Sequence, residues 1–204
     1  MNYQKWQRMN QTFEAGFWGD CANTYAEETK QIAYARVMGL VPGTWEAGEA
    51  WPWWDLQGAS VVDFGGGPTS LLLKCVGLGT AIVVDPCPYP DWVAARYEAH
   101  GVTLVPEMGE DFSGGGFDEA WCYNVLQHVS DPRMVTESIK AAAPRRRVFE
   151  WIDVKPHPGH PHELKAHLLE EWYGAEGQVV LLDAQYRETF DGFQRAWGGC
   201  LWGE

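Results

Sequence analysis

Three consecutive glycines and a later acidic residue carry the clearest chemical signal in the sequence. The run Val-Val-Asp-Phe at 61–64 leads directly into Gly65, Gly66 and Gly67. Glycine permits a tight turn and a close approach of a ligand to the backbone. Asp85 ends a second apolar run about 20 residues after Gly65, the spacing at which a carboxylate accepts hydrogen bonds from both hydroxyls of a ribose. Together these features predict a site for a ligand that contains a nucleoside.

Two alternatives bear on this site. Asp85 could instead cap the next helix, but Pro86 and Pro88 delay the start of that helix, which favours the ribose-binding role. Dinucleotide-binding enzymes use the same geometry with a G-x-G-x-x-G fingerprint. Here Ser70 occupies the third glycine position, and no second βαβ half follows for another nucleotide. A single adenosine-containing ligand therefore fits better, and an NAD-dependent oxidoreductase is the weaker alternative.

Histidines supply the candidates for acid–base chemistry. His157, His160 and His162 lie within six positions, but they lack the helical i, i+4 spacing, and prolines separate them. We therefore expect no metal site. His160 and His162 are candidate general bases, with an ordinary loop or capping role as the alternative. His128 follows Asn124 by four residues, so a helical turn would bring the two onto one face; its alternative role is helix packing.

The elements that must position these residues alternate along the chain. Short apolar runs at 60–64, 80–84, 102–105, 117–123 and 147–152 predict strands. Helical patterns lie between them at 69–76, 91–100 and 132–143. This alternation predicts a parallel sheet with helices on both faces. The tail differs, because 178–182 and 192–197 read as two strands without an intervening helix, and we expect an antiparallel hairpin at one edge.

The first part of the chain has a different composition. A helix is predicted over 22–40, with Thr24 and Glu27 as a capping box. Residues 41–58 are rich in Trp, Gly and Pro and predict a long loop or lid. We expect residues 1–58 to form a cap on a single sheet domain at 59–204. The aromatic and polar side chains that could complete the site from this segment are Phe17, Trp18, Asn23, Tyr25 and Lys30.

Taken in order, the motifs over residues 59–152 resemble those of class I S-adenosylmethionine-dependent methyltransferases. Residues 63–67 resemble the first motif of that family and 83–85 the second. Residues 109–112 and 117–121 resemble its acidic turn and the next strand, and 124–132 resemble the segment that follows. The resemblance implies a Rossmann-like sheet, mostly parallel, with an antiparallel C-terminal edge hairpin.

The resemblance also implies a role for each matching residue. Asp63 would orient the turn near the amino-acid part of S-adenosylmethionine, and Asp85 would hold the ribose. Asp111 would accept a hydrogen bond from the adenine amino group, and the Phe112 N–H would reach a ring nitrogen. Asn124 would lie near the methionine part. The full set implied is Asp63, Gly65, Gly66, Gly67, Asp85, Pro86, Glu110, Asp111, Phe112 and Asn124, with Cys87 beside the adenine.

The implied activity is methyl transfer to a small-molecule acceptor, with S-adenosylhomocysteine as the product. The Asn/Asp-Pro-Pro-aromatic motif of amino-methylating members is absent, and Tyr123-Asn124-Val125-Leu126 stands in its place. This departure favours oxygen slightly as the acceptor atom. A binding protein that keeps the cofactor site but has lost catalysis is the main alternative.

Composition narrows the partners. The 204 residues carry a formal net charge of −13, which repels a phosphate backbone and argues against long nucleic acid. The one basic cluster, at 145–147, is expected in a solvated loop. No apolar run is long enough to span a membrane, no signal peptide is evident, and the five cysteines form no C-x-x-C pair. A reduced, cytoplasmic protein is expected, and the sequence predicts no oligomeric state.

Overall fold

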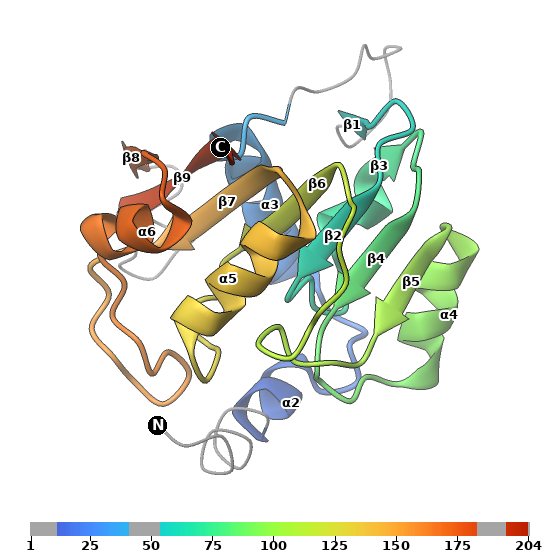
Figure 1. The fold of residues 1–204 in the computed structure, drawn as a ribbon. Helices are drawn as coiled ribbons and strands as arrows, with labels where there is room; N and C mark the ends of the chain where they lie inside the picture. The colour runs from blue at the N-terminus through green and yellow to red at the C-terminus, as the bar shows by residue number, and fades with distance from the viewer. Residues whose placement is uncertain (1–11, 41–53, 183–194, 204) are drawn as a thin grey trace.

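A seven-stranded sheet forms the centre of the computed structural model, which describes residues 12–40, 54–182 and 195–203 (Figure 1). Its strands are β2 (Val61–Phe64), β4 (Ala81–Val84), β5 (Val102–Val105), β6 (Glu119–Tyr123), β7 (Arg145–Trp151), β8 (Gln178–Leu181) and β9 (Arg195–Trp202). The order across the sheet is β5-β4-β2-β6-β7-β9-β8. The first five strands in this order run parallel, and β9 is antiparallel to both β7 and β8. The predicted parallel sheet with an antiparallel edge hairpin is confirmed.

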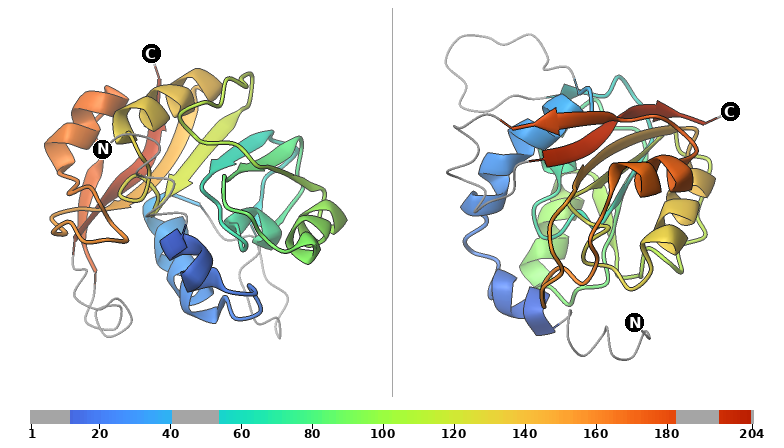
Figure 2. Two further views of the ribbon diagram at one scale, coloured as in Figure 1. Left: turned by 90° about the horizontal axis from the view of Figure 1, so that it is seen from below. Right: turned by 90° about the vertical axis from the view of Figure 1, so that its left-hand side faces the viewer.

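Helices cover both faces of this sheet, as predicted (Figure 2). The helices are α2 (Thr12–Trp18), α3 (Tyr25–Val37), α4 (Asp91–Ala99), α5 (Pro132–Ala142) and α6 (Ala166–Tyr173). One buried cluster joins α3 and α4 to one face, and a second joins α5 and α6 to the other. All five residues of β6 are buried, because a central parallel strand is covered on both sides. No helix in the described ranges is long and apolar enough to cross a membrane.

The helix predicted over 69–76 is wrong. A short 3₁₀ helix at Leu71–Lys74 takes its place, and β3 (Cys75–Val76) then pairs with β1 (Trp54–Asp55) in a separate two-stranded parallel sheet. The Leu71 N–H donates to the Tyr123 hydroxyl at 2.9 Å, and the Leu72 N–H donates to the Ser70 hydroxyl at 3.0 Å. These side chains cap the start of the short helix. It ends after one turn because Cys75 is extended and begins β3.

Three other predictions near the ends of elements need comment. The capping box does not form, because the Thr24 hydroxyl donates to Glu28 at 2.6 Å and makes no side-chain cap. The lid predicted from the Trp-rich loop falls mostly on 41–53, outside the described residues, as do 192–194 of the last predicted strand. Within the described part, residues 54–55 of that loop form β1.

The basic cluster is not a solvated loop, because Arg145, Arg146 and Arg147 begin β7. Arg147 and Arg145 each donate to the buried carboxylate of Glu119 at 2.6 Å. The Trp121 indole donates to the same carboxylate at 2.8 Å. Arg147 also donates to two carbonyl oxygens at the end of α3, both at 2.9 Å. Opposite charge therefore holds these arginines inside the fold, where they join the sheet to α3.

Replacing Glu119 by Gln removes the anion that these guanidinium groups surround. We expect the free energy of unfolding to fall by about 3 kcal/mol, because removing one partner of a buried ion pair leaves the other charge buried and uncompensated. Urea denaturation measures this loss. Glu137→Gln, which breaks an exposed pair with Lys140, should change stability little; equal losses in both variants would contradict the argument.

Candidate functional site

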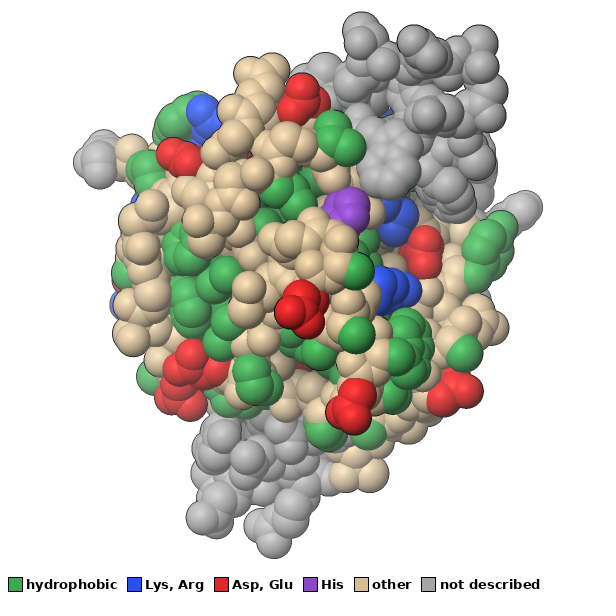
Figure 3. Space-filling model, turned by 90° about the vertical axis from the view of Figure 1, so that its right-hand side faces the viewer, with side chains coloured by type: hydrophobic (Ala, Val, Ile, Leu, Met, Phe, Trp, Pro, Cys, Tyr) green, Lys and Arg blue, Asp and Glu red, His purple; other side chains and the backbone are tan. Residues whose placement is uncertain are grey.

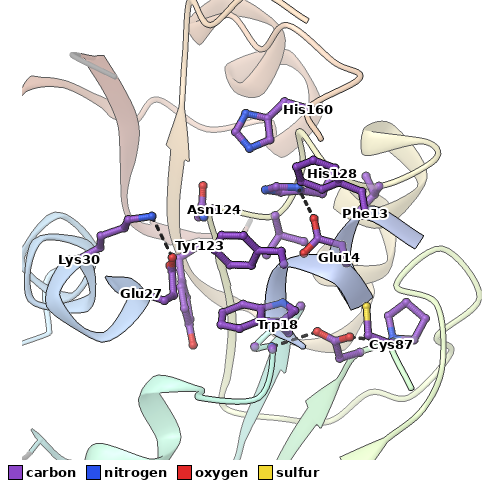
Figure 4. A pocket seen from close by; sticks show the side chains of 18 of the residues that line it. Phe13, Glu14, Trp18, Glu27, Lys30, Cys87, Tyr123, Asn124, His128 and His160 are labelled. Atoms are coloured by element: carbon purple, nitrogen blue, oxygen red, sulfur yellow. Dashed lines mark hydrogen bonds and ion pairs between the residues drawn. The ribbon is translucent and has the colours of Figure 1, made fainter. Parts of the chain in front are cut away.

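A cavity of about 310 Å³ opens where the parallel strands β2, β4 and β6 end (Figure 4). Its volume lies at the lower end of the range typical of small-molecule sites, about 300–1,000 Å³. The walls come from the glycine turn after β2, the residues that follow β4 and β6, the loop after β7, and the N-terminal helices α2 and α3. Open α/β sheets place ligands at this edge, so the cavity is the candidate active site.

The glycine turn lies at the floor of the cavity. Gly65 and Gly67 have φ values of +68° and +64°. Residues other than glycine rarely adopt this backbone conformation. A Cβ on Gly65 would lie 2.6 Å from Val125, and a Cβ on Gly66 would lie 2.6 Å from a carboxylate oxygen of Asp63. All three glycines line the cavity. The turn therefore requires glycine for backbone geometry and for space.

Asp63 holds this turn from behind. One of its carboxylate oxygens accepts hydrogen bonds from the Ser70 hydroxyl at 2.5 Å and from the Tyr123 hydroxyl at 2.6 Å. Asp63 is fully buried, and that burial raises its pKa to about 7. The side chain does not line the cavity, whereas the Tyr123 ring does. Asp63 thus contacts the turn from beneath, through Ser70 and Tyr123.

Asp85 lines the cavity opposite the turn. One carboxylate oxygen accepts the Gly67 N–H at 3.0 Å, and the other accepts the Cys87 N–H at 2.9 Å. Pro86 and Cys87 line the same wall. The alternative role as a helix cap is wrong, because α4 starts at Asp91 with Pro90 as its N-cap residue. The structure thus brings together the two features that the sequence paired.

Glu110, Asp111 and Phe112 are not brought to the cavity lining. Glu110 instead accepts hydrogen bonds from two N–H groups at the start of α5, at 2.9 and 3.1 Å. The Phe112 N–H donates to Met108 at 3.1 Å, and its ring packs edge-on against Phe64. Asp111 is exposed. The expectation that the Phe112 amide is available to an adenine ring is therefore corrected: a backbone turn already uses it.

Asn124 directly follows β6 and lines the cavity in a left-handed backbone conformation with φ +60°. Its side-chain oxygen accepts a hydrogen bond from Gln127 at 2.6 Å. The residues after it are fixed by Glu150, a buried carboxylate that accepts the N–H groups of Val125 and Leu126 at 3.1–3.2 Å. Burial raises the pKa of Glu150 to about 7. The sequence marked Glu150 only as one of several candidate residues at the end of its strand, and it could not show these partners, which lie 24 and 25 positions away.

Two histidines meet at the far end of the cavity. The rings of His128 and His160 lie 4.4 Å apart and nearly perpendicular, and both residues line the cavity with His157. His162 does not line it, because its Nε2 lies 2.9 Å from the Val129 carbonyl oxygen. The expected catalytic role of His162 is corrected on this ground. The described residues contain no cluster of His, Cys, Asp and Glu that could hold a metal ion.

A carboxylate from α2 sets the charge of this pair. Glu14 lies 3.1 Å from Nδ1 of His128 (Figure 4). Burial lowers the pKa of His128, but the Glu14 carboxylate outweighs it and leaves that pKa above its ordinary value. Burial, with the charge on His128, lowers the pKa of His160 to about 3. At neutral pH, His160 is therefore a neutral hydrogen-bonding group beside a Glu14–His128 pair.

The N-terminal helices complete the walls. Phe17, Trp18 and Lys30 line the cavity as expected, and Lys30 pairs with Glu27 at 3.1 Å. Asn23 and Tyr25 do not reach it and are exposed. Sequence reasoning missed residues that reach the cavity only across the fold, namely Phe13, Glu14, Glu27, Gln31, Tyr89 and Tyr123.

No protein-family model matches the sequence, and no curated protein matches it either. Solved structures do resemble the fold. The DhpI complex with S-adenosylhomocysteine shares 16% identity over 99% of each chain, with a TM-score of 0.62. Magnesium protoporphyrin IX methyltransferase of Synechocystis PCC 6803, with bound S-adenosylmethionine, shares 15% identity over 96% of this chain and 89% of its own, with a TM-score of 0.54.

A third similar structure is the phosphoethanolamine N-methyltransferase 2 of Haemonchus contortus, at 14% identity. The matched region spans 93% of this chain and 48% of the Haemonchus chain, with a TM-score of 0.59. At these identities the likeness concerns the fold. The chain has the Rossmann-like fold of class I S-adenosylmethionine-dependent methyltransferases, which confirms the expected fold.

Replacing Glu14 by Gln should lower the pKa of the His128 imidazole, because the carboxylate that opposes burial is gone. An NMR titration of the imidazole protons measures this change. Since folding raises this pKa, the pair stabilises the protein below pH 6.5, the ordinary value, and that contribution is lost as the pH rises through the raised pKa. Glu98→Gln, an exposed change on α4, is the control; the same His128 titration curve in wild type and Glu14→Gln would contradict the pairing.

Proposed function

We propose that the protein transfers a methyl group from S-adenosylmethionine to a small-molecule acceptor and releases S-adenosylhomocysteine. The observation that carries this proposal is the carboxylate of Asp85, which is hydrogen-bonded to the glycine turn and lines the same cavity at the carboxyl ends of parallel strands. The neighbouring structures with S-adenosylmethionine or S-adenosylhomocysteine support the choice of cofactor.

The residues at the turn fit this cofactor. The absence of a Cβ at Gly65 lets the turn lie directly against the Val125 side chain. A carboxylate oxygen has more than one acceptor site, so each oxygen of Asp85 could accept a ribose hydroxyl beside its backbone bond. Pro86 and Cys87 would flank the adenine, and Asn124 would lie near the methionine part. The cofactor supplies an electrophilic methyl group, and the protein supplies placement.

The far end of the cavity suits the acceptor. An acceptor hydroxyl loses its proton on methyl transfer, so a general base beside it accelerates the reaction. Glu14 next to Nδ1 of His128 favours the tautomer that carries a proton there, which leaves Nε2 to accept the proton of the hydroxyl. The neutral His160 ring would accept or donate a hydrogen bond to the same group. These features favour oxygen as the acceptor atom.

The size and charge of the site favour a small acceptor. The cavity of about 310 Å³ must hold the cofactor as well as the acceptor, unless a wall moves. The net charge of −13 disfavours a nucleic acid. Residues 1–58 would act as the cap of the sheet domain at 59–204, because α2 and α3 supply cavity walls.

Calorimetry with S-adenosylmethionine, S-adenosylhomocysteine and NAD tests the cofactor. We expect the first two to bind and NAD not to bind. The Asp85→Asn variant should bind S-adenosylmethionine roughly tenfold to a hundredfold more weakly, because charge-assisted hydrogen bonds contribute about 1.5–3 kcal/mol. The control variant, Asp91→Asn, changes an exposed residue in the first turn of α4. It should bind S-adenosylmethionine with the wild-type affinity. Tight binding of NAD alone would refute the proposal in favour of an oxidoreductase.

A methyl-transfer screen against small hydroxyl compounds tests catalysis. With an acceptor in hand, His128→Gln should lower kcat by about a hundredfold or more and leave the affinity for S-adenosylmethionine unchanged. His160→Gln should also lower kcat, and His167→Gln, an exposed change on α6, should not. If S-adenosylmethionine binds but no acceptor is methylated, the protein is a binding protein without catalysis.

A further inference from the structure

A second hollow lies on the opposite side of the glycine turn from the cavity. It has a volume of about 340 Å³ and lies between α3, the 3₁₀ helix and α4. Its lining shares no residue with the lining of the cavity. Lys74, Arg96 and His100 line it with a single acid, Glu28. Figure 3 shows histidine and basic side chains gathered on this face of the molecule. In a chain with a net charge of −13, this grouping is unusual.

Lys74 is fixed in the wall of the hollow. Its side chain is only 12% exposed, and its ammonium lies 3.2 Å from Glu28 and 2.6 Å from the side-chain oxygen of Gln31. Glu28 is held from its other side by the Thr24 hydroxyl at 2.6 Å. The ammonium is therefore positioned in advance, at little further entropic cost to a ligand.

Arg96 is fixed in the same way. One guanidinium nitrogen donates to the Pro68 carbonyl, and the group lies over the Trp92 ring at 5.2 Å from its centroid. Its Nε is buried and has no hydrogen-bond partner among the described residues. A buried donor without a partner is costly. His100 completes the wall, with Nε2 3.0 Å from the Cys75 carbonyl oxygen.

We propose that this hollow binds a small anion that carries a phosphate group, between Lys74 and Arg96. Two basic side chains, Lys74 and Arg96, line the hollow with one carboxylate, that of Glu28, so the hollow carries an excess of positive charge. A phosphate offers several acceptor oxygens, which suit a guanidinium and an ammonium together. The proposal does not depend on the methyl-transfer function, because the two linings are separate.

Titration of the full-length protein with inorganic phosphate at low ionic strength, followed by calorimetry and by ³¹P NMR line width, tests the site. We expect saturable binding that weakens as sodium chloride is added. The Lys74→Met variant keeps the aliphatic part of the side chain and should bind phosphate at least tenfold more weakly. The Glu28→Gln variant removes the competing carboxylate and should bind phosphate several-fold more tightly. Opposite shifts from two touching residues are not the result of general destabilisation.

Matched variants come from a second lysine–carboxylate pair on α5. Lys140→Met and Glu137→Gln change the net charge by the same amounts at a distant surface, and phosphate affinity should stay within twofold of wild type. Circular dichroism checks that every variant is folded. Equal effects from the two pairs would overturn the proposal, because only net charge would then matter.

Saturating S-adenosylmethionine separates this hollow from the cavity. Phosphate affinity should be unchanged, whereas displacement of phosphate would assign the anion to the glycine turn and overturn the proposal. A parallel titration with AMP tests the source of the phosphate: binding that Lys74→Met weakens indicates an organic phosphate ester, and binding of inorganic phosphate alone indicates the free anion. No saturable binding of either compound would also overturn the proposal.

Discussion

The site depends on one buried carboxyl group, that of Asp63. It joins the strand that enters the glycine turn to Ser70, which leaves the turn, and to Tyr123 at the end of β6. These bonds fix the turn against two strands at once, and the turn in turn presents the Gly67 N–H to Asp85. Burial raises the pKa of Asp63 to about 7, and the hydrogen bonds from its two hydroxyl partners oppose that rise because they favour the carboxylate. The cavity floor is therefore set by a few short polar contacts inside an apolar core.

The features that sequence reasoning predicted correctly are local ones. Short continuous apolar runs mark the strands, because a central parallel strand is covered on both faces. Glycine at Gly65 and Gly67 reports a backbone conformation of those same residues, and Asp85 lies just where its strand ends. The helix expected over 69–76 failed because the chain becomes extended at Cys75, where β3 pairs with β1, about 20 positions earlier in the sequence. Periodicity contains no information about such a partner.

The acceptor end of the cavity shows the same limit. His128 and His160 stood out in the sequence as histidines near strand ends, but their charge states come from Glu14 on α2 and from each other. The 7-residue helix α2 buries none of its residues, so no amphipathic pattern marks it in the sequence. His162 looked equivalent to His160, and a single carbonyl contact, with Val129, separates their roles. Spacing identifies candidate residues, and only the fold decides among them.

The cavity and the hollow meet at the far side of the same turn. Gln31 lines the cavity, donates to the Thr69 carbonyl and accepts a hydrogen bond from Lys74 in the wall of the hollow. Arg96 donates to the Pro68 carbonyl one residue earlier. The Pro68 carbonyl is thus held by Arg96 from the wall of the hollow, and the Thr69 carbonyl by Gln31 from the wall of the cavity, while Asp63 holds the turn from below. Pro68 and Thr69 are both buried, so their carbonyl groups need donors from within the protein, and Gln31 of α3 supplies one of them.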